Sequence, residues 1–84
     1  MMRNVLFRQA VAGVIRSRRA LAGLTQAQLA ERIGGSEIGV RTWERAASSP
    51  SLETFLHLAD ALGVDARELL GEIQSRMALL QDRD

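Results

Sequence analysis

The stretch that decides the fold is residues 23–45, GLTQAQLAERIGGSEIGVRTWER. It contains two short segments with helical periodicity, separated by a pair of glycines at 34–35. In the first segment Thr25 is a helix N-cap, and Gln28, three residues later, completes a capping box. In the second segment Ser36 is in position to cap the next helix. The sequence therefore predicts two short helices joined by a tight turn.

Each of these two helices has apolar residues on one face. Leu29 and Ile33 face inward on the first helix, and Val40 and Trp43 face inward on the second. Ala30 is small where the two helices are expected to cross. Stacking of Trp43 on a base is the alternative role, but its spacing beside Val40 favours the core. The arrangement is that of a helix-turn-helix, whose second helix is presented to the major groove of DNA.

Three further helical patterns surround this motif, at about residues 4–22, 51–62 and from 65 onward. No strand pattern is found, so we expect an all-α fold with five helices. The chain is predicted to form a single domain over residues 1–84, with a compact core at about 5–70 and a C-terminal helical extension at 71–84. The apolar faces predicted for the first and fourth helices consist of Phe7, Val11, Val14 and Ile15, and of Leu52, Phe55, Leu56, Ala59 and Leu62.

The C-terminal pattern continues further than one domain of this kind requires. Leu70, Ile73, Met77 and Leu80 follow one another at intervals of 3, 4 and 3 residues, as in a coiled-coil seam. If the core is complete by about Leu70, the later residues are exposed and suit a homodimer contact. The alternative is that the helix packs back on its own domain.

Composition and charge restrict the class of protein. The chain has 84 residues, 46% of them hydrophobic, and no cysteine, so one small domain without disulfides is expected in a reducing cytoplasm. Residues 1–45 hold eight arginines and three acids, whereas residues 46–84 hold three arginines and seven acids. A basic half beside an acidic half is typical of a protein that binds nucleic acid through one face. The N-terminus lacks the apolar run of a signal peptide, and no membrane-spanning stretch is expected.

Enzymatic chemistry has no signature in this sequence. The single histidine, His57, is expected on the outer side of its helix with Asp60 three residues later, and no nucleophile or second histidine is near it in sequence. Phosphate-binding loops and metal-binding helical motifs are absent from the sequence. We therefore expect no catalysis, no metal and no cofactor.

The motif and the segments that follow it resemble one family. Residues 23–45, together with PSLETFLHLADALGV (50–64) and DARELL (65–70), are similar to the Cro/cI-type (XRE-type) helix-turn-helix family, which is lambda-repressor-like. The resemblance covers roughly residues 11–70. It implies a compact five-helix DNA-binding domain and a sequence-specific transcriptional regulator, encoded by a bacterium or a phage and nucleoid-associated when bound.

The resemblance also implies roles for individual residues. Gln26 would contact a phosphate, Arg45 would lie near the DNA backbone, and Arg19 would pair with Glu44 to fix the orientation of the reading helix. Glu37, Ile38, Arg41 and Thr42 would project from the reading helix toward the base edges. The full set of implied DNA contacts is Gln26, Ser36, Glu37, Ile38, Arg41, Thr42 and Arg45.

Three positions depart from the family pattern. Gly35 stands where the family usually has an apolar residue, which is expected to loosen the packing of the turn. Ala46 and Ala47 replace a common glycine and a common basic residue, so the reading helix is expected to continue a turn further and to lack a phosphate contact. Glu37 is an acid where a glutamine or arginine often reads bases. Two roles are possible for Glu37: it stabilises the helix dipole from the first turn, or it accepts a hydrogen bond from N4 of cytosine.

Together these observations predict a dimeric repressor that binds a palindromic operator in double-stranded DNA. We expect cytosine opposite Glu37, a thymine methyl near Ile38 and guanine under Arg41. The competing hypothesis is a protein-interaction module, such as an antitoxin-like subunit, that keeps the fold but binds DNA weakly or not at all. Its partner would be a toxin or another regulator.

Overall fold

The computed structural model describes residues 2–82, with side chains from residue 4 onward. It contains α1 (Met2–Leu21), α2 (Gln26–Arg32), α3 (Glu37–Glu44), α4 (Leu52–Leu62) and α5 (Ala66–Gln81). No residue of this described part lies in a strand. The expectation of an all-α fold with five helices is confirmed.

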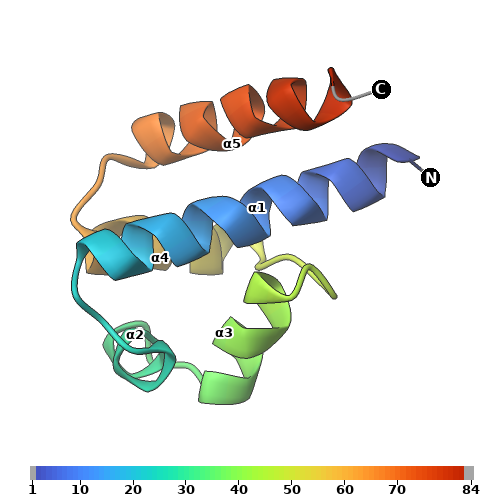
Figure 1. Cartoon of the computed structure of the whole chain (residues 1–84). Helices are drawn as coiled ribbons and strands as arrows, with labels where there is room; N and C mark the ends of the chain where they lie inside the picture. Colours follow the sequence, from blue (N-terminus) through green and yellow to red (C-terminus); the bar gives the residue numbers. More distant parts are fainter. Residues whose placement is uncertain (1, 83–84) are drawn as a thin grey trace.

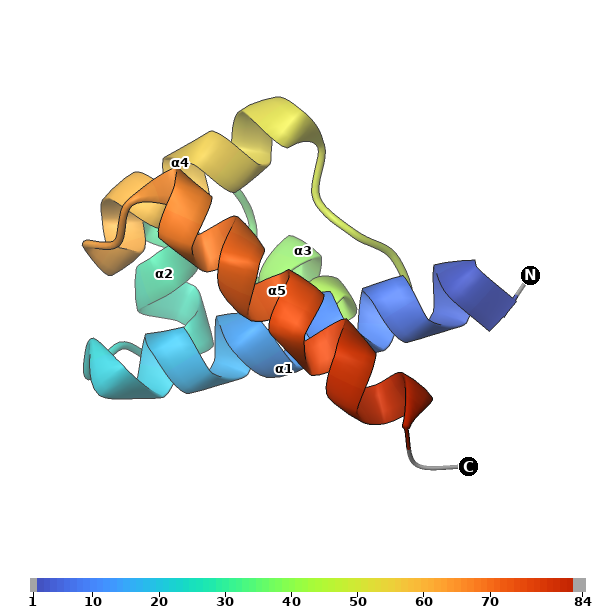
Figure 2. The ribbon, with the colours of Figure 1, turned by 90° about the horizontal axis from the view of Figure 1, so that it is seen from above.

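The helix α1 is the central element of the fold. In Figure 1, α5 lies on one side of α1, and α2 and α3 lie on the other. The helix α4 lies behind α1 in this view and packs against α5 and α2. Figure 2 shows from above that α5 crosses over α1 at an angle, and that the first turns of α1 and the last turns of α5 lie at the same end of the molecule. Opposite sides of α1 therefore pack against different helices, α5 on one side and α3 on the other.

Aliphatic side chains from all five helices fill the core. The largest fully buried ones are Leu29, Val40, Leu58 and Leu69, which come from α2, α3, α4 and α5 in turn. In α1, all six residues from 10 to 15 are buried. Burying one such aliphatic side chain stabilises the folded state by roughly 1.5–3 kcal/mol. Because every helix contributes to the same cluster, none of them can leave without exposing the core to water.

The buried face of α4 differs from the predicted one. Leu58, which was not assigned to the core, is completely buried, whereas Leu52 and Leu56 are 75% and 50% exposed. The apolar arc of α4 is wider than one stripe, and the core takes the stripe that contains Phe55, Leu58, Ala59 and Leu62. The remaining leucines are left on the surface, so the prediction for Leu52 and Leu56 is wrong.

The helix α5 packs back on α1, which was the alternative considered for it. Ile73 is only 3% exposed, and Met77 and Leu80 are half-buried against the same core. The predictions that the core closes near Leu70 and that Ile73 is exposed are therefore wrong. The physical reason lies in α1, which is apolar all round at residues 10–15 and needs a further helix to cover the side turned away from α3.

Polar contacts also join α5 to α1. Arg18 of α1 forms ion pairs with Glu68 and Glu72 of α5. The hydrogen bond from Arg18 lowers the pKa of Glu72 below its ordinary value, although partial burial opposes that shift. One turn away, the side chain of Arg76 lies across Gly13, where an added Cβ would stand 2.3 Å from its Nη1 atom. The glycine therefore permits the arginine to pack flat on α1.

Candidate nucleic-acid interface

The turn between α2 and α3 is built from local hydrogen bonds that the sequence anticipates. The Thr25 hydroxyl accepts from the Gln28 amide at 3.0 Å, and the Gln28 side chain accepts from the Thr25 amide at 2.9 Å, which completes the capping box. The Ser36 hydroxyl accepts from the Gly39 amide at 3.1 Å and caps α3. Between them Gly34 adopts φ +67°, a left-handed conformation that favours glycine. The predicted helix starts at Thr25 and Ser36 are confirmed.

The inner face of α3 fixes this helix to the domain. Val40 is completely buried and Trp43 is half-buried against the core cluster, so the core role expected of Trp43 is confirmed. Glu44, at the end of the helix, is the one buried charged residue of the described chain, at 4% exposure. A buried carboxylate requires a charged partner and hydrogen bonds to offset its lost hydration.

Glu44 receives those partners from α1 and α2. Its Oε2 lies 2.6 Å from Nε of Arg19, and its Oε1 accepts from Nη2 of Arg19 at 2.9 Å and from Nε2 of Gln26 at 3.0 Å. The contact with Glu44 raises the pKa of the Arg19 guanidinium, which partial burial opposes. The ion pair implied by the family resemblance is present in the structure. Two N–H groups of the planar guanidinium each bond one carboxylate oxygen, so the pair fixes the orientation of α3 relative to α1.

The position of Gln26 differs from its expected role. Its amide nitrogen donates to Glu44 inside the domain, so the side chain is turned toward α3. An amide nitrogen carries two N–H donors, so one donor of Gln26 remains for a phosphate after the contact with Glu44. The sequence resemblance did not indicate that this residue supports the buried carboxylate.

The outer face of α3 holds the predicted reading residues. Glu37, Ile38, Arg41 and Arg45 are exposed, and Thr42 is half-buried. Nη2 of Arg41 lies 3.0 Å from Oε2 of Glu37, one helical turn away, so the two charged side chains pair with each other. The Thr42 hydroxyl donates to the Ile38 carbonyl at 2.7 Å. This face therefore presents one ion pair, one isoleucine that is 72% exposed and one further arginine.

The C-terminal end of α3 does not continue as predicted. The helix ends at Glu44, and Ala46 adopts φ +61°, the only left-handed residue other than glycine in the described chain. The Ala46 amide donates to Trp43 O and the Ala47 amide donates to Thr42 O, which is the hydrogen-bond pattern of a Schellman C-cap. The prediction of an extra turn is wrong because these two bonds satisfy the last carbonyls without further helix.

Two arginines that sequence reasoning did not assign contact this same helix end. Nε of Arg8 donates to the Ala46 carbonyl at 3.2 Å, and Nη1 of Arg16 donates to the Glu44 carbonyl at 2.5 Å. Arg8, Arg16 and Arg19 are spaced 8 and 3 residues apart, which places them within one side of α1 at 3.6 residues per turn. That spacing is the signal in the sequence that could have identified them.

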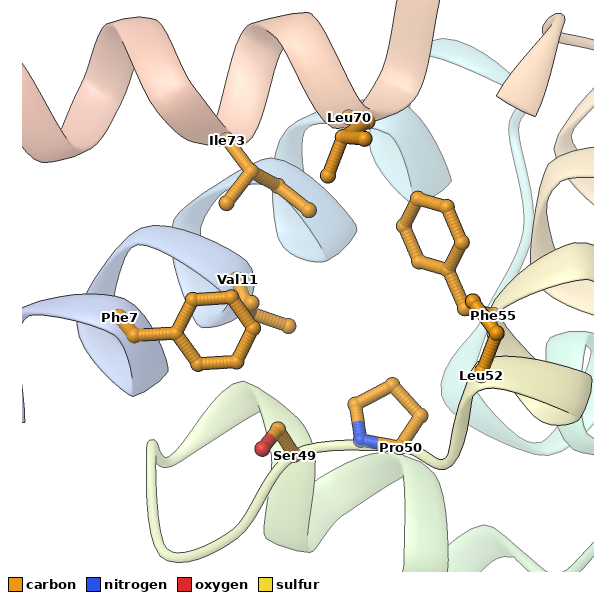
Figure 3. A pocket seen from close by; sticks show the side chains of 8 residues that line it. All are labelled: Phe7, Val11, Ser49, Pro50, Leu52, Phe55, Leu70 and Ile73. Carbon is orange, nitrogen blue, oxygen red and sulfur yellow. The ribbon is translucent and has the colours of Figure 1, made fainter. Parts of the chain in front are cut away.

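An apolar pocket lies on another side of the domain, between α1, α4, α5 and the segment that joins α3 to α4. It has a volume of about 240 Å³. Figure 3 shows Phe7 and Val11 entering it from α1, Leu70 and Ile73 from α5, and Phe55 from α4. Two of the four residues predicted to form a dimer contact thus line a pocket of their own domain. Of these, Leu70 is 47% exposed and Ile73 is buried.

The single histidine of the chain lies on the surface. His57 and Asp60 are both exposed on α4. Within residues 2–82, no group of three acids or histidines is arranged to hold a metal ion. Over the same residues, none of the helices has the length and apolar character needed to cross a bilayer.

Comparisons with known proteins agree on one class. A family model described as Helix-turn-helix matches residues 15–69. Among solved structures, the clp gene regulator ClgR from Corynebacterium glutamicum is 31% identical with a TM-score of 0.85, over 92% of this chain and 82% of that chain. The hypothetical transcription factor NHTF from Neisseria is 33% identical with a TM-score of 0.74, over 87% of this chain and 84% of that chain. No curated protein matches the chain significantly.

Proposed function

Because this chain belongs to the XRE-type helix-turn-helix family of DNA-binding transcription regulators, we propose that it represses transcription as a homodimer bound to a palindromic operator. The observation that carries this proposal is the division of α3 into two faces. Its inner face is fixed by Val40 and by the pair of Glu44 with Arg19, whereas Glu37, Ile38 and Arg41 on its outer face are exposed. A helix held in this way can enter the major groove without rearrangement of the domain.

The outer face of α3 supplies groups that suit base edges. Arg41 can donate two hydrogen bonds to guanine O6 and N7, Glu37 can accept from cytosine N4, and Ile38 can contact a thymine methyl. The ion pair between Glu37 and Arg41 orients both side chains before DNA binds. In the complex each side chain would give up part of its contact with the other to bind a base. We therefore expect the base preferences of Glu37 and Arg41 to depend on each other.

Contacts to the DNA backbone would position this helix. Arg45 is exposed directly after α3, and Gln26 retains one N–H donor beyond its bond to Glu44. Residues 1–45, which include α1 to α3, hold eight of the eleven arginines, whereas residues 46–84, which include α4 and α5, hold seven of the ten acids. The negative field of α4 and α5 would keep that side of the domain away from DNA.

The dimer that we propose uses apolar side chains of α4 and α5. Leu52 and Leu70 line the same pocket and are 75% and 47% exposed, and Leu56 lies one turn along α4 from Leu52. This surface keeps Leu70 from the sequence-based prediction and replaces the buried Ile73. A two-fold axis would place the two copies of α3 about 34 Å apart, which matches one turn of DNA.

Selection from a randomised duplex pool at low salt tests the proposal. We expect the chain to enrich a two-fold symmetric sequence and to lose affinity steeply as salt rises. The variant Arg41→Ala should lower affinity for the selected duplex by about 1–3 kcal/mol and relax the preference at one position of each half-site. Arg67→Ala, which changes an exposed arginine of α5, is the matched control and should leave binding unchanged.

The second candidate is a protein-interaction module, which the pairing of Arg41 with an acid favours. In that case the selection would enrich no sequence, even at low salt. A protein partner such as a toxin would then be expected to bind the leucine surface of α4 and α5. Failure of the selection, together with a monomeric chain that gains a protein partner, would favour this candidate over the repressor.

A further inference from the structure

Three arginines gather at the C-terminal end of α3, and two of them come from α1. Arg45 follows the helix directly, while Arg8 and Arg16 reach it from α1 through the carbonyls of Ala46 and Glu44. Arg8 lies outside the residues that the helix-turn-helix model matches. The nearby carboxylate of Glu44 is already paired with Arg19. The end of the reading helix is therefore surrounded by positive charge that no neighbouring acid in the described contacts neutralises.

The guanidinium groups of Arg8 and Arg16 keep donors to spare. Each group has five N–H donors. In the described part of the chain, Arg8 commits Nε to Ala46 O, and Arg16 commits Nη1 to Glu44 O. Arg8 is half-buried and Arg16 is exposed, so solvent reaches both side chains. Each arginine can therefore hold the helix end with one donor and bind an anion with others.

If α3 enters the major groove, its length would place this helix end at the DNA backbone. The helix has eight residues and, at 1.5 Å per residue, is about 12 Å long, the width of the major groove. When the residues near Ser36 contact base edges, the other end emerges at the edge of the groove, where the phosphates lie. The C-terminus of a helix carries a partial negative charge that would repel a phosphate. Arg16, on the Glu44 carbonyl, and Arg8, on the Ala46 carbonyl just beyond the helix, offset that repulsion.

We propose that Arg8 and Arg16 of α1 bind an operator phosphate at the C-terminal end of α3. This inference rests on the proposed function, because it requires that α3 enters the major groove. It accounts for the uncharged Ala47, since the family often has a basic residue there and Arg8 contacts the adjoining Ala46 carbonyl. The phosphate contact that this loop lacks is thereby supplied from α1.

Salt dependence of binding tests this assignment on the duplex that the wild-type chain selects. Arg8→Ala and Arg16→Ala should each reduce the slope of log affinity against log salt by up to about 0.9, the value for one lost phosphate contact. Arg8→Gln keeps an N–H donor for the Ala46 carbonyl but removes the charge, so it should reduce the slope while leaving the urea midpoint close to that of the wild type. Arg67→Ala, far from α3, should keep the wild-type slope.

A neutral methylphosphonate at each backbone position of the same duplex provides a second readout. At one position it should weaken binding of the wild type but not of the double variant Arg8→Gln and Arg16→Gln. The inference is overturned if the variants keep the wild-type slope, or if they lose affinity equally at every salt concentration because the domain is destabilised. If the wild type binds no duplex at low salt, the proposed function itself fails, which is a separate outcome.

Discussion

Arg19 of α1 and Glu44 of α3, 25 residues apart in sequence, form a two-pronged ion pair that leaves the carboxylate only 4% exposed. Arg19 also donates from Nη1 to the Leu24 carbonyl at 2.9 Å, so one side chain links α1, α3 and the segment before α2. The pair joins α1 to α3, the helix whose outer face is proposed to read DNA. Changes to it should therefore affect both stability and binding.

Replacement of Arg19 by methionine should lower the free energy of unfolding by about 3 kcal/mol, because Glu44 would remain buried with no charged partner. Urea denaturation measures this loss. The double variant Arg19→Met and Glu44→Leu removes the orphaned charge and should recover most of the stability. It should still bind the operator less well than the wild type, because the two hydrogen bonds that orient α3 relative to α1 are lost. If the Arg19→Met variant is as stable as the wild type, the ion pair contributes little to the free energy of unfolding.

Replacement of Ala46 by glycine should stabilise the protein by about 1 kcal/mol. Ala46 has a left-handed backbone, in which a Cβ atom is unfavourable, and glycine removes that strain. At the ends of α1, α2 and α4 the equivalent left-handed residue is already glycine. Thermal unfolding measures the gain, and the converse change Gly34→Ala should destabilise the domain by a similar amount. A lower melting temperature for Ala46→Gly would contradict this account of the helix end.

Replacement of Glu37 by glutamine should raise the affinity for DNA and change the preferred sequence. The change removes a negative charge from the reading face and releases Arg41 from a pair worth about 0.3–0.5 kcal/mol. Preference for cytosine at the contacted position should weaken, because a glutamine can donate as well as accept. A second duplex selection with the variant measures the shift. An unchanged consensus would mean that Glu37 does not contact a base.

Acidification should destabilise the contact between α1 and α5. The hydrogen bond from Arg18 keeps the pKa of Glu72 below its ordinary value of 4.5, so the carboxylate is more acidic in the folded state than in the unfolded chain. Its contribution is fully present above pH 4.5 and is lost as the pH falls through the folded pKa. Urea midpoints measured from pH 6 to pH 3 should fall less steeply for Glu72→Gln than for the wild type. Glu53→Gln, an exposed change on α4, should keep the wild-type profile.

Replacement of Leu70 by glutamate should abolish the proposed dimer. Leu70 lies at the mouth of the apolar pocket, and a charge there would be buried without a partner in a dimer interface. Leu79→Glu, also on an exposed position of α5 but outside the pocket, is the matched control. Size-exclusion chromatography with light scattering at tens of micromolar should find dimers for wild type and Leu79→Glu. A monomeric wild type, free and on DNA, would rule out the dimer.

The helix-turn-helix formed by α2 and α3 could be predicted from residues close together in sequence. The hydrogen bonds that begin α2 and α3 involve residues three apart, so Thr25, Gln28 and Ser36 could be assigned from spacing alone. The inward direction of Val40 and Trp43 follows from helical periodicity, because α3 has only one apolar stripe. The pairing of Arg19 with Glu44 was available only through the family resemblance, since no local spacing joins residues 25 apart.

The tertiary structure decided the features that depend on which neighbour an element meets. Two apolar stripes of α4 compete for the core, and packing selected Leu58 over Leu52 and Leu56. Ile73 is buried because α1 is apolar on the side that α5 covers. The contacts of Arg8 and Arg16 with the end of α3 are likewise decided by the tertiary structure, because they join residues far apart in sequence. The sequence by itself thus determined the five helices and the exposed outer face of α3, because caps and periodicity act within a few residues, whereas only the folded arrangement decided which residues support that face.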